Sequence, residues 1–210
     1  MKKYKNLIII DAGHGGIDDN GNYTTAPGKM FKHKNGEIAY EGKFNRELST
    51  FIGQIAEQLG YDVVYTVNPF DATDVSLKDR VAIANDYIGQ AENAVFISIH
   101  GDACKNHNAI GWSIYTTKKV NNSDILAEVI ADSVEPYMKN VSRCKFDIYS
   151  DGDKDKEVNY YIIKLVNCPS VLLENGFFDN WNDWIKMKDS KHQSLLATYI
   201  VEGIDNYFKK

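Results

Sequence analysis

The chain has 210 residues, of which 43% are hydrophobic and 25% are charged, a composition typical of a globular protein with a single domain. Its net charge of −5, without a stripe of Lys and Arg, argues against a protein that binds nucleic acid in general. No apolar stretch approaches the length of a membrane span, so we expect no insertion into a membrane.

The beginning of the chain does not have the pattern of a secretory signal. Residues 1–6 lead into only four apolar residues, followed by the charged Asp11. A signal peptide has an apolar region of roughly 7–15 residues and a cleavage site with small residues. We therefore expect synthesis in the cytoplasm.

The first half of the chain predicts a strand, a loop, a helix and a second strand. Residues 7–10 are a short apolar run, typical of a buried strand. Residues 15–40 are polar and hold five glycines, which predicts a long loop that is functional or mobile. Over residues 41–59 apolar side chains recur at steps of three and four, which indicates an amphipathic helix ended by Gly60. Residues 61–67 then predict a strand.

Strands and helices continue to alternate in the middle of the chain. Ser76 is a candidate N-cap for a helix that extends to about Ile88. The apolar run of residues 94–99 predicts a strand that ends at His100. A further strand and a helix are expected at residues 111–117 and 123–138.

The last third of the chain is less regular. We expect a short strand at residues 145–149 and a solvated loop at 151–157, and residues 160–166 fit a helix or a strand. Residues 171–173 predict a strand ending at Glu174, and helical patterns follow at about 180–188 and 190–208. The alternation predicts one α/β domain over residues 1–210, with mostly parallel strands and no separate wall-binding domain.

Three apolar runs end in groups that bind metals or move protons. The first run leads through Asp11 to His14, the second to His100 and the third to Glu174. In open α/β sheets, active sites lie outside the carboxyl ends of the strands. We therefore expect two imidazoles and a carboxylate to meet at one edge of the sheet, as in a catalytic zinc site.

A hydrolytic zinc site needs three protein ligands and one position open to water. His14 and His100 are the candidate imidazoles, and each has a small glycine neighbour. The third ligand should be a carboxylate, for which Glu41 at the start of a predicted helix and Glu37 in the preceding loop both qualify. Glu174, at the end of an apolar strand, fits a general base.

Each of these residues also has a structural interpretation. Glu41 could interact with the helix macrodipole, and Glu174 could form a buried ion pair with Lys164 or Arg80. Arg80 itself fits a structural role on its helix. Three further histidines have no matching context and are expected to be exposed or hydrogen-bonded: His33, His107 and His192. Three tryptophans are expected to pack, with a sugar or peptide groove as the alternative: Trp112, Trp181 and Trp184.

The cysteines favour reduced thiols over a disulfide framework, because they are three in number and lack a CxxC spacing: Cys104, Cys144 and Cys168. Cys104 lies between His100 and His107 in a pattern that could bind a metal by itself. The segment lacks the partner pair that a structural zinc module needs, so we do not expect a separate metal site there.

Several motifs occur together, in a fixed order, from about residue 7 to the C-terminal helix. They are Asp-Ala-Gly-His-Gly-Gly at 11–16, Glu41 with Asn45, Ser-Leu-Lys-Asp-Arg at 76–80 followed by Ala84-Asn85, Phe-Ile-Ser-Ile-His at 96–100 and Leu-Leu-Glu-Asn-Gly-Phe at 172–177. In this combination the chain resembles the zinc-dependent N-acetylmuramoyl-L-alanine amidases.

The resemblance implies a fold, a ligand set and a reaction. The fold would be α/β, with a mixed, mostly parallel sheet of roughly six strands flanked by helices. One Zn²⁺ would be bound by His14, Glu41 and His100, which selects Glu41 over Glu37, and Glu174 would be the catalytic glutamate. The reaction would cleave the amide between the lactyl group of N-acetylmuramic acid and L-alanine of the peptidoglycan stem.

The resemblance also implies a biological setting. The expected partner is bacterial peptidoglycan, and we expect a monomer that acts on the cell wall after release, as a phage or prophage endolysin does. The alternatives are another zinc hydrolase of wall fragments, such as a deacetylase or carboxypeptidase, and a non-catalytic peptidoglycan-binding module. The chain departs from the family pattern in its long 15–40 loop and at residues 101–103 and 178–180.

Overall fold

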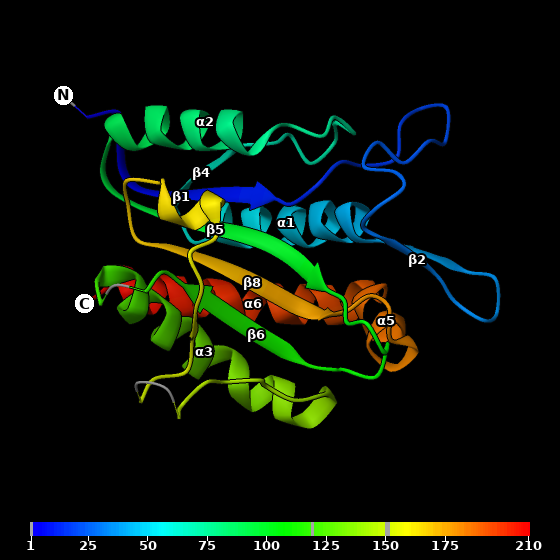
Figure 1. The fold of residues 1–210 in the computed structure, drawn as a ribbon. Coiled ribbons are helices and arrows are strands. Elements are labelled where there is room, and N and C mark those ends of the chain that lie inside the picture. The colour runs from blue at the N-terminus through cyan, green and yellow to red at the C-terminus, as the bar shows by residue number, and fades with distance from the viewer. Residues whose placement is uncertain (1, 119, 150–151) are drawn as a thin grey trace.

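The computed structural model describes residues 2–118, 120–149 and 152–210 (Figure 1). Its centre is a six-stranded sheet in the order β4-β1-β5-β8-β6-β7. The pairs in this sheet are parallel except for the antiparallel pair β6–β8. The six strands are β1 (Tyr4–Ala12), β4 (Asp62–Tyr65), β5 (Ala91–Asp102), β6 (Trp112–Thr116), β7 (Lys156–Glu157) and β8 (Ser170–Phe177). The predicted α/β class with a mixed, mostly parallel sheet is confirmed.

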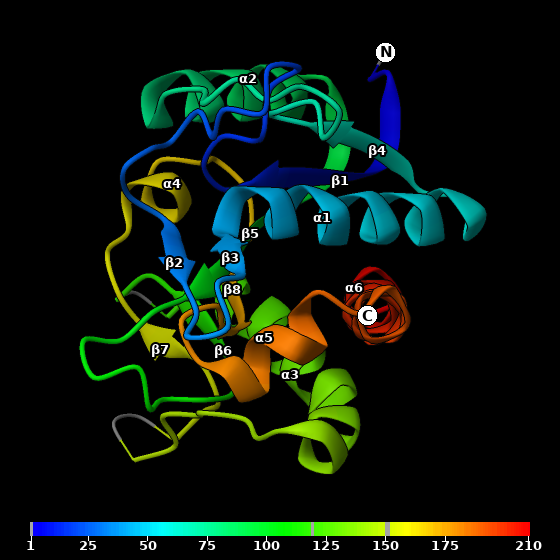
Figure 2. The ribbon, with the colours of Figure 1, turned by 90° about the vertical axis from the view of Figure 1, so that its right-hand side faces the viewer.

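Helices cover both faces of the sheet, as Figure 2 shows. Three long helices pack on one face: α1 (Glu41–Gln58), α3 (Asn122–Val141) and α6 (Ser190–Phe208). Two helices pack on the other: α2 (Leu77–Gly89) and α4 (Tyr161–Lys164). Alternate residues of β1 belong to the two cores, since Ile8 and Ile10 lie in one and Leu7 and Ile9 in the other. Burial on both faces explains why the strand is a continuous apolar run.

The 15–40 segment is more ordered than predicted. It contains an antiparallel hairpin of β2 (Met30–Lys32) and β3 (Ile38–Tyr40), in which Met30 pairs with Tyr40. Gly36 has a φ of +89° in the turn between the two strands, a conformation that glycine adopts without strain. The prediction of an irregular loop is therefore wrong over these residues.

The segment after α3 also differs from the prediction. No strand is present over residues 145–149, because the chain makes only a local contact with β6, through the N–H of Lys145 and the carbonyl of Trp112. The edge strand is instead β7, within the segment expected to be a loop. The start of that predicted loop, Asp151, lies outside the described residues. The ambiguous segment 160–166 forms the short helix α4.

The remaining short helix, α5 (Trp181–Met187), follows β8 at the end of the sheet toward which β5 and β8 run (Figure 1). The hairpin lies at the same end. Within the residues that the structure covers, no helix combines the length and the apolar character needed to cross a bilayer.

Candidate metal centre

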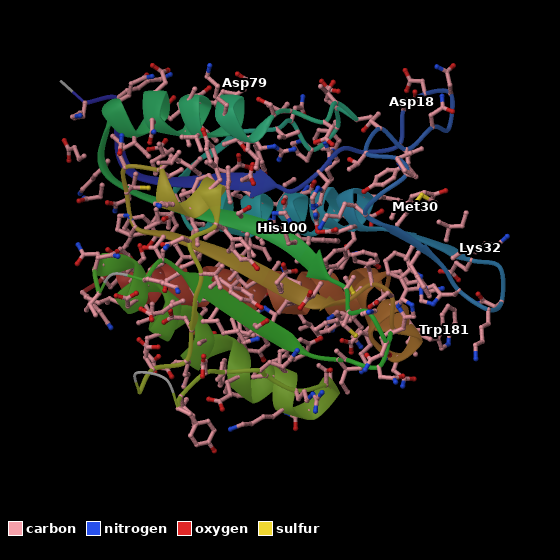
Figure 3. All side chains as sticks on the ribbon, viewed as in Figure 1. Asp18, Met30, Lys32, Asp79, His100 and Trp181 are labelled. Carbon is pink, nitrogen blue, oxygen red and sulfur yellow. The ribbon has the colours of Figure 1, made fainter. Side chains whose placement is uncertain are left out.

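Three neighbouring strands bring the predicted site residues to one end of the sheet. β1 and β8 both pair with β5, and in the β5–β8 ladder His100 is the partner of Glu174. His14 lies just beyond the end of β1, and Glu41 is the first residue of α1. The position of Glu41 is fixed by its N–H, which donates to the Lys29 carbonyl at 3.0 Å. Figure 3 labels His100 near the end of its strand.

His14, Glu41 and His100 form a compact cluster. Glu41 Oε1 lies 3.1 Å from His14 Nε2 and 3.1 Å from His100 Nδ1. The two imidazole rings have centroids 5.0 Å apart and an interplanar angle of 85°. One donor atom from each of the three residues lies within 4.8 Å of the others, and no second cluster of this kind occurs among the described residues.

Gly13 allows the close packing of this cluster. A Cβ atom at position 13 would lie 2.2 Å from Cε1 of His100, which is shorter than a van der Waals contact with the imidazole ring. The next residue, His14, has a φ of +66°, which is uncommon for a residue with a side chain. The Gly-His pair therefore turns the chain sharply at the end of β1 and leaves room for the second imidazole.

The carboxyl group of Glu41 is electrostatically suited to bind a cation. The side chain is fully buried, and although burial alone would raise its pKa, the contacts with His100 and His14 hold the pKa of Glu41 well below its usual range. The other oxygen, Oε2, lies 3.6 Å from Lys29 Nζ. Glu41 is thus a carboxylate with one oxygen directed at the two imidazoles.

The donor set fits a zinc ion. Two imidazole nitrogens and one carboxylate oxygen are a common catalytic zinc set, with a fourth position left for water. Ligands of a tetrahedral zinc ion are separated from one another by about 3.3 Å, close to the two 3.1 Å distances here. In addition, His14 Nε2 and Glu41 Oε2 are buried and have no hydrogen-bond partner within the described chain. Buried nitrogen and oxygen atoms without a hydrogen bond indicate a place for a cation.

Glu174 lies beside the cluster. Its Oε2 is buried and accepts no hydrogen bond from any described residue. Burial, together with the carboxylates of Glu41 and Asp102, raises the pKa of Glu174 well above its usual range, while Lys29 and Lys156 oppose this shift. A carboxyl group with a raised pKa next to three metal-type donors is able to exchange a proton.

A buried polar network holds the turn that carries His14. Arg80 is buried, forms an ion pair with Asp11 at 3.0 Å and donates to the carbonyl of His14 at 2.9 Å. Arg46 donates to the same carbonyl, also at 2.9 Å. Arg80 therefore has the structural role expected for it and is not paired with Glu174. The part played by Arg46 was not predicted, and its position five residues after Glu41 on the same helix was the available signal.

Asparagine side chains connect the site to its supporting strands and helix. Asn45 Nδ2 donates to the carbonyl of Gly13, and Asn175 Nδ2 donates to the carbonyl of His100. Asn175 also accepts a hydrogen bond from the indole N–H of the buried Trp112. The asparagines of the two sequence motifs that contain Glu41 and Glu174 therefore support the backbone of the candidate metal-binding residues.

The competing site residues are engaged elsewhere. Glu37 accepts hydrogen bonds from the Trp184 indole at 2.6 Å and from Lys188 at 2.7 Å, away from the two imidazoles. His107 contacts Asp179 at 2.7 Å. Among the described residues, His107, Cys104 and His100 do not form a cluster with metal-binding geometry. All three cysteines are free, as predicted.

The other histidines have the hydrogen bonds expected of them. His33 Nε2 lies 3.1 Å from the carbonyl oxygen of Phe178, and His192 Nδ1 lies 2.6 Å from the hydroxyl of Tyr137. Both imidazoles are buried.

Comparisons with known proteins agree with this geometry. A family model described as N-acetylmuramoyl-L-alanine amidase matches residues 8–206. The probable cell wall amidase LytH of Staphylococcus aureus is 31% identical over 201 residues, which cover 96% of this chain. The matched region is 58% of LytH, so the chain spans little more than half the length of the curated relatives it matches.

Solved structures show the same fold. An N-acetylmuramoyl-L-alanine amidase from Clostridium difficile 630 superposes with a TM-score of 0.77 at 26% identity, and covers 99% of each chain. The catalytic domain of CwlV, an amidase from Bacillus (Paenibacillus) polymyxa var. colistinus, superposes with a TM-score of 0.72 at 26% identity, covering 97% of this chain and 98% of that one.

Proposed function

Because the chain belongs to the N-acetylmuramoyl-L-alanine amidase family, we propose that it is a zinc-dependent hydrolase of bacterial peptidoglycan. The bond cleaved is the amide between the lactyl group of N-acetylmuramic acid and L-alanine of the stem peptide. The observation that carries the proposal is the contact of Glu41 Oε1 with both imidazoles, 3.1 Å from each, beside a fourth polar group at Glu174.

In this proposal His14, Glu41 and His100 hold one Zn²⁺. When bound, zinc supplies a Lewis acid that polarises a carbonyl and lowers the pKa of water. The protein contributes the rigidity of the site, since Asn45, Arg46 and Arg80 fix the backbone around His14 by hydrogen bonds.

Glu174 is the proton carrier. Its Oε2 has no competing donor from the described residues, so it is available to accept a proton from the attacking water. The same carboxyl group then donates that proton to the nitrogen of L-alanine as the amide C–N bond breaks. The products are a free lactyl carboxylate on the sugar and a free amine on the stem peptide.

Mass spectrometry of muropeptides after digestion tests this reaction. The proposal predicts separated glycan and stem peptide, the latter with an N-terminal L-alanine, and loss of this product when a zinc chelator is added. A deacetylase would release acetate and a carboxypeptidase would release a C-terminal amino acid, and either product would contradict the amidase assignment. Intact muropeptides with saturable binding would instead indicate a non-catalytic binding module.

The setting of the reaction is a separate part of the proposal. We retain the endolysin role, with action on the cell wall after release, and the monomeric state as predictions. The endolysin role is tested by two measurements of bacterial lysis. In one the purified protein is added to cells from outside, and in the other it is expressed inside them together with a pore-forming protein.

A further inference from the structure

A pocket of about 630 Å³ lies beside the metal centre and takes no part in it. One wall comes from the β2–β3 hairpin, with Phe31 and Asn35, and the opposite wall from the segments after β5 and β8, with Asn106, Asp179 and Trp181. Figure 3 shows Lys32 of the hairpin and Trp181 of α5 at the same end of the molecule. The size is within the range of small-molecule sites.

Side-chain contacts fix the walls of this pocket. The imidazole of His33 contacts the Phe178 carbonyl at 3.1 Å and the Trp181 ring at 5.1 Å between centroids. The rings of Phe31 and His107 are 4.6 Å apart. Glu37, in the hairpin turn, is bound by the indole N–H of Trp184 on α5. The hairpin and α5 therefore enclose a space that exists before any ligand binds.

Both walls of the pocket belong to segments that adjoin the catalytic end of the sheet. Lys29, directly before β2, accepts the hydrogen bond from the N–H of Glu41. On the other wall, Asp179 follows β8 and accepts a hydrogen bond from the N–H of Cys104, which follows β5. A Cβ atom at Gly101, next to His100, would lie 3.5 Å from the Phe178 ring and 3.6 Å from Glu41 Cγ, and the Phe178 carbonyl contacts His33 of the lining. The pocket is therefore within reach of a polymer whose reacting bond lies at Glu41 and Glu174.

The lining has the chemistry of a sugar site. Trp181 is 40% exposed, with Lys188 Nζ 5.1 Å from its ring centroid, and the exposed part of the ring is accessible to the apolar face of a sugar ring. Neutral amides surround it, from three asparagines: Asn35, Asn106 and Asn108. The side-chain oxygens of Asn35 and Asn106 already accept hydrogen bonds within the chain, and the amide N–H groups can donate to hydroxyl and acetamido oxygens without requiring a charge.

Asp179 adds a buried acceptor to this lining. It is 4% exposed, and its Oδ2 accepts from Cys104 N–H and contacts His107, but its Oδ1 has no hydrogen-bond partner in the part of the chain that is described. A hydroxyl or amide N–H would satisfy this oxygen.

We infer that this pocket is a subsite for an N-acetylhexosamine of the glycan strand, adjacent to the sugar whose amide is cleaved. The inference rests on the proposed function, because it takes the polymer at the metal centre to be peptidoglycan. Trp181 and Phe31 provide the aromatic surface, and the asparagines with Asp179 bind the polar groups of the sugar.

Binding of peptide-free glycan tests this inference without any catalysis. The probe is the tetrasaccharide of alternating N-acetylglucosamine and N-acetylmuramic acid, titrated by calorimetry. We expect Trp181→Ala to weaken binding about tenfold, the size of a lost aromatic contact. Asn106→Ala, on the opposite wall, should also weaken it. Ile185→Ala is the matched control, because Ile185 is 41% exposed on the same helix but does not line the pocket.

Hydrolysis of two substrates separates the inference from the proposed reaction. With a tetrasaccharide-linked stem peptide, Trp181→Ala should raise KM about tenfold with little change in kcat, whereas a stem peptide on a single N-acetylmuramic acid should show no such change. Equal effects on both substrates, or binding of free stem peptide that depends on Trp181, would overturn the sugar assignment. Tetrasaccharide binding that depends on Trp181 in a protein without amidase activity would uphold the subsite and remove the reaction.

Discussion

His100 and Glu174 are direct partners in the parallel ladder of β5 and β8. The register places a metal-type imidazole and a proton-accepting carboxyl group side by side, although 74 positions, from 100 to 174, separate them in the sequence. Because both strands are central and buried, their relative register is strongly fixed. The catalytic geometry is therefore a property of the sheet.

Glu174→Gln should abolish most hydrolysis and leave the metal site intact. The amide has nearly the same shape but does not accept and return a proton, and loss of a general base costs roughly 10²–10⁴-fold in rate. Turnover of muropeptides and zinc content by elemental analysis measure the two effects. The control is Glu202→Gln, an exposed position on α6. Unchanged turnover in Glu174→Gln would remove the assignment of Glu174 as base.

His14→Ala and His100→Ala should each reduce the bound zinc toward zero. Each substitution removes one of three protein ligands, and two ligands do not retain zinc at a catalytic site against a chelator. His107→Ala should keep its zinc, because His107 contacts Asp179 and is outside the cluster. Stoichiometric zinc in both purified ligand variants would contradict the predicted ligand set.

Arg80→Met should destabilise the fold. The substitution leaves Asp11 as a buried carboxylate without its ion-pair partner, which typically costs about 3–5 kcal/mol. Lys78→Met, at an exposed position of the same helix, should change the free energy of unfolding by less than about 0.5 kcal/mol. Urea denaturation of the two variants gives the comparison. Equal stability would show that the Asp11–Arg80 pair is dispensable.

Stability should fall in weakly acidic solution because of His192. Burial, with Lys186 nearby, lowers the pKa of this imidazole to about 4, from a usual value of 6.5. The unfolded chain therefore takes up the proton first, so this contribution is complete above pH 6.5 and is lost as the pH falls toward 4. The shift corresponds to about 3 kcal/mol.

The free energy of unfolding, measured by urea denaturation at pH 7.5 and pH 4.5, tests this contribution. His192→Gln should show a smaller decrease between the two pH values than the unsubstituted protein, because glutamine does not titrate. The same decrease in both proteins would indicate that other groups account for the acid sensitivity.

The sequence predicts the central elements because their signals are local and strong. The short apolar runs before His14, His100 and Glu174 are typical of buried strands, and a period of three to four residues marks α1. Strand ends in an α/β sheet meet at one edge, so the positions of the site residues followed from the order of the elements.

The missed elements depend on contacts between distant parts of the chain. β2 and β3 have three residues each, and their hairpin is held by His33 against Phe178 and by Glu37 against Trp184 and Lys188. β7 has only two residues, and it forms by pairing with the edge of β6. The choice between Glu37 and Glu41 likewise required either the family resemblance or the structure, because the partners of Glu37 lie about 150 residues away.

Anomalous diffraction at the zinc edge, from crystals grown with Zn²⁺, tests the central claim most directly. The account predicts one strong peak within bonding distance, about 2.0–2.2 Å, of a nitrogen of His14, a nitrogen of His100 and a carboxylate oxygen of Glu41. Glu174 should lie beside the ion without bonding to it. A peak bound by other residues, or zinc-soaked crystals in which Glu41 still contacts both imidazoles with no peak between them, would contradict it.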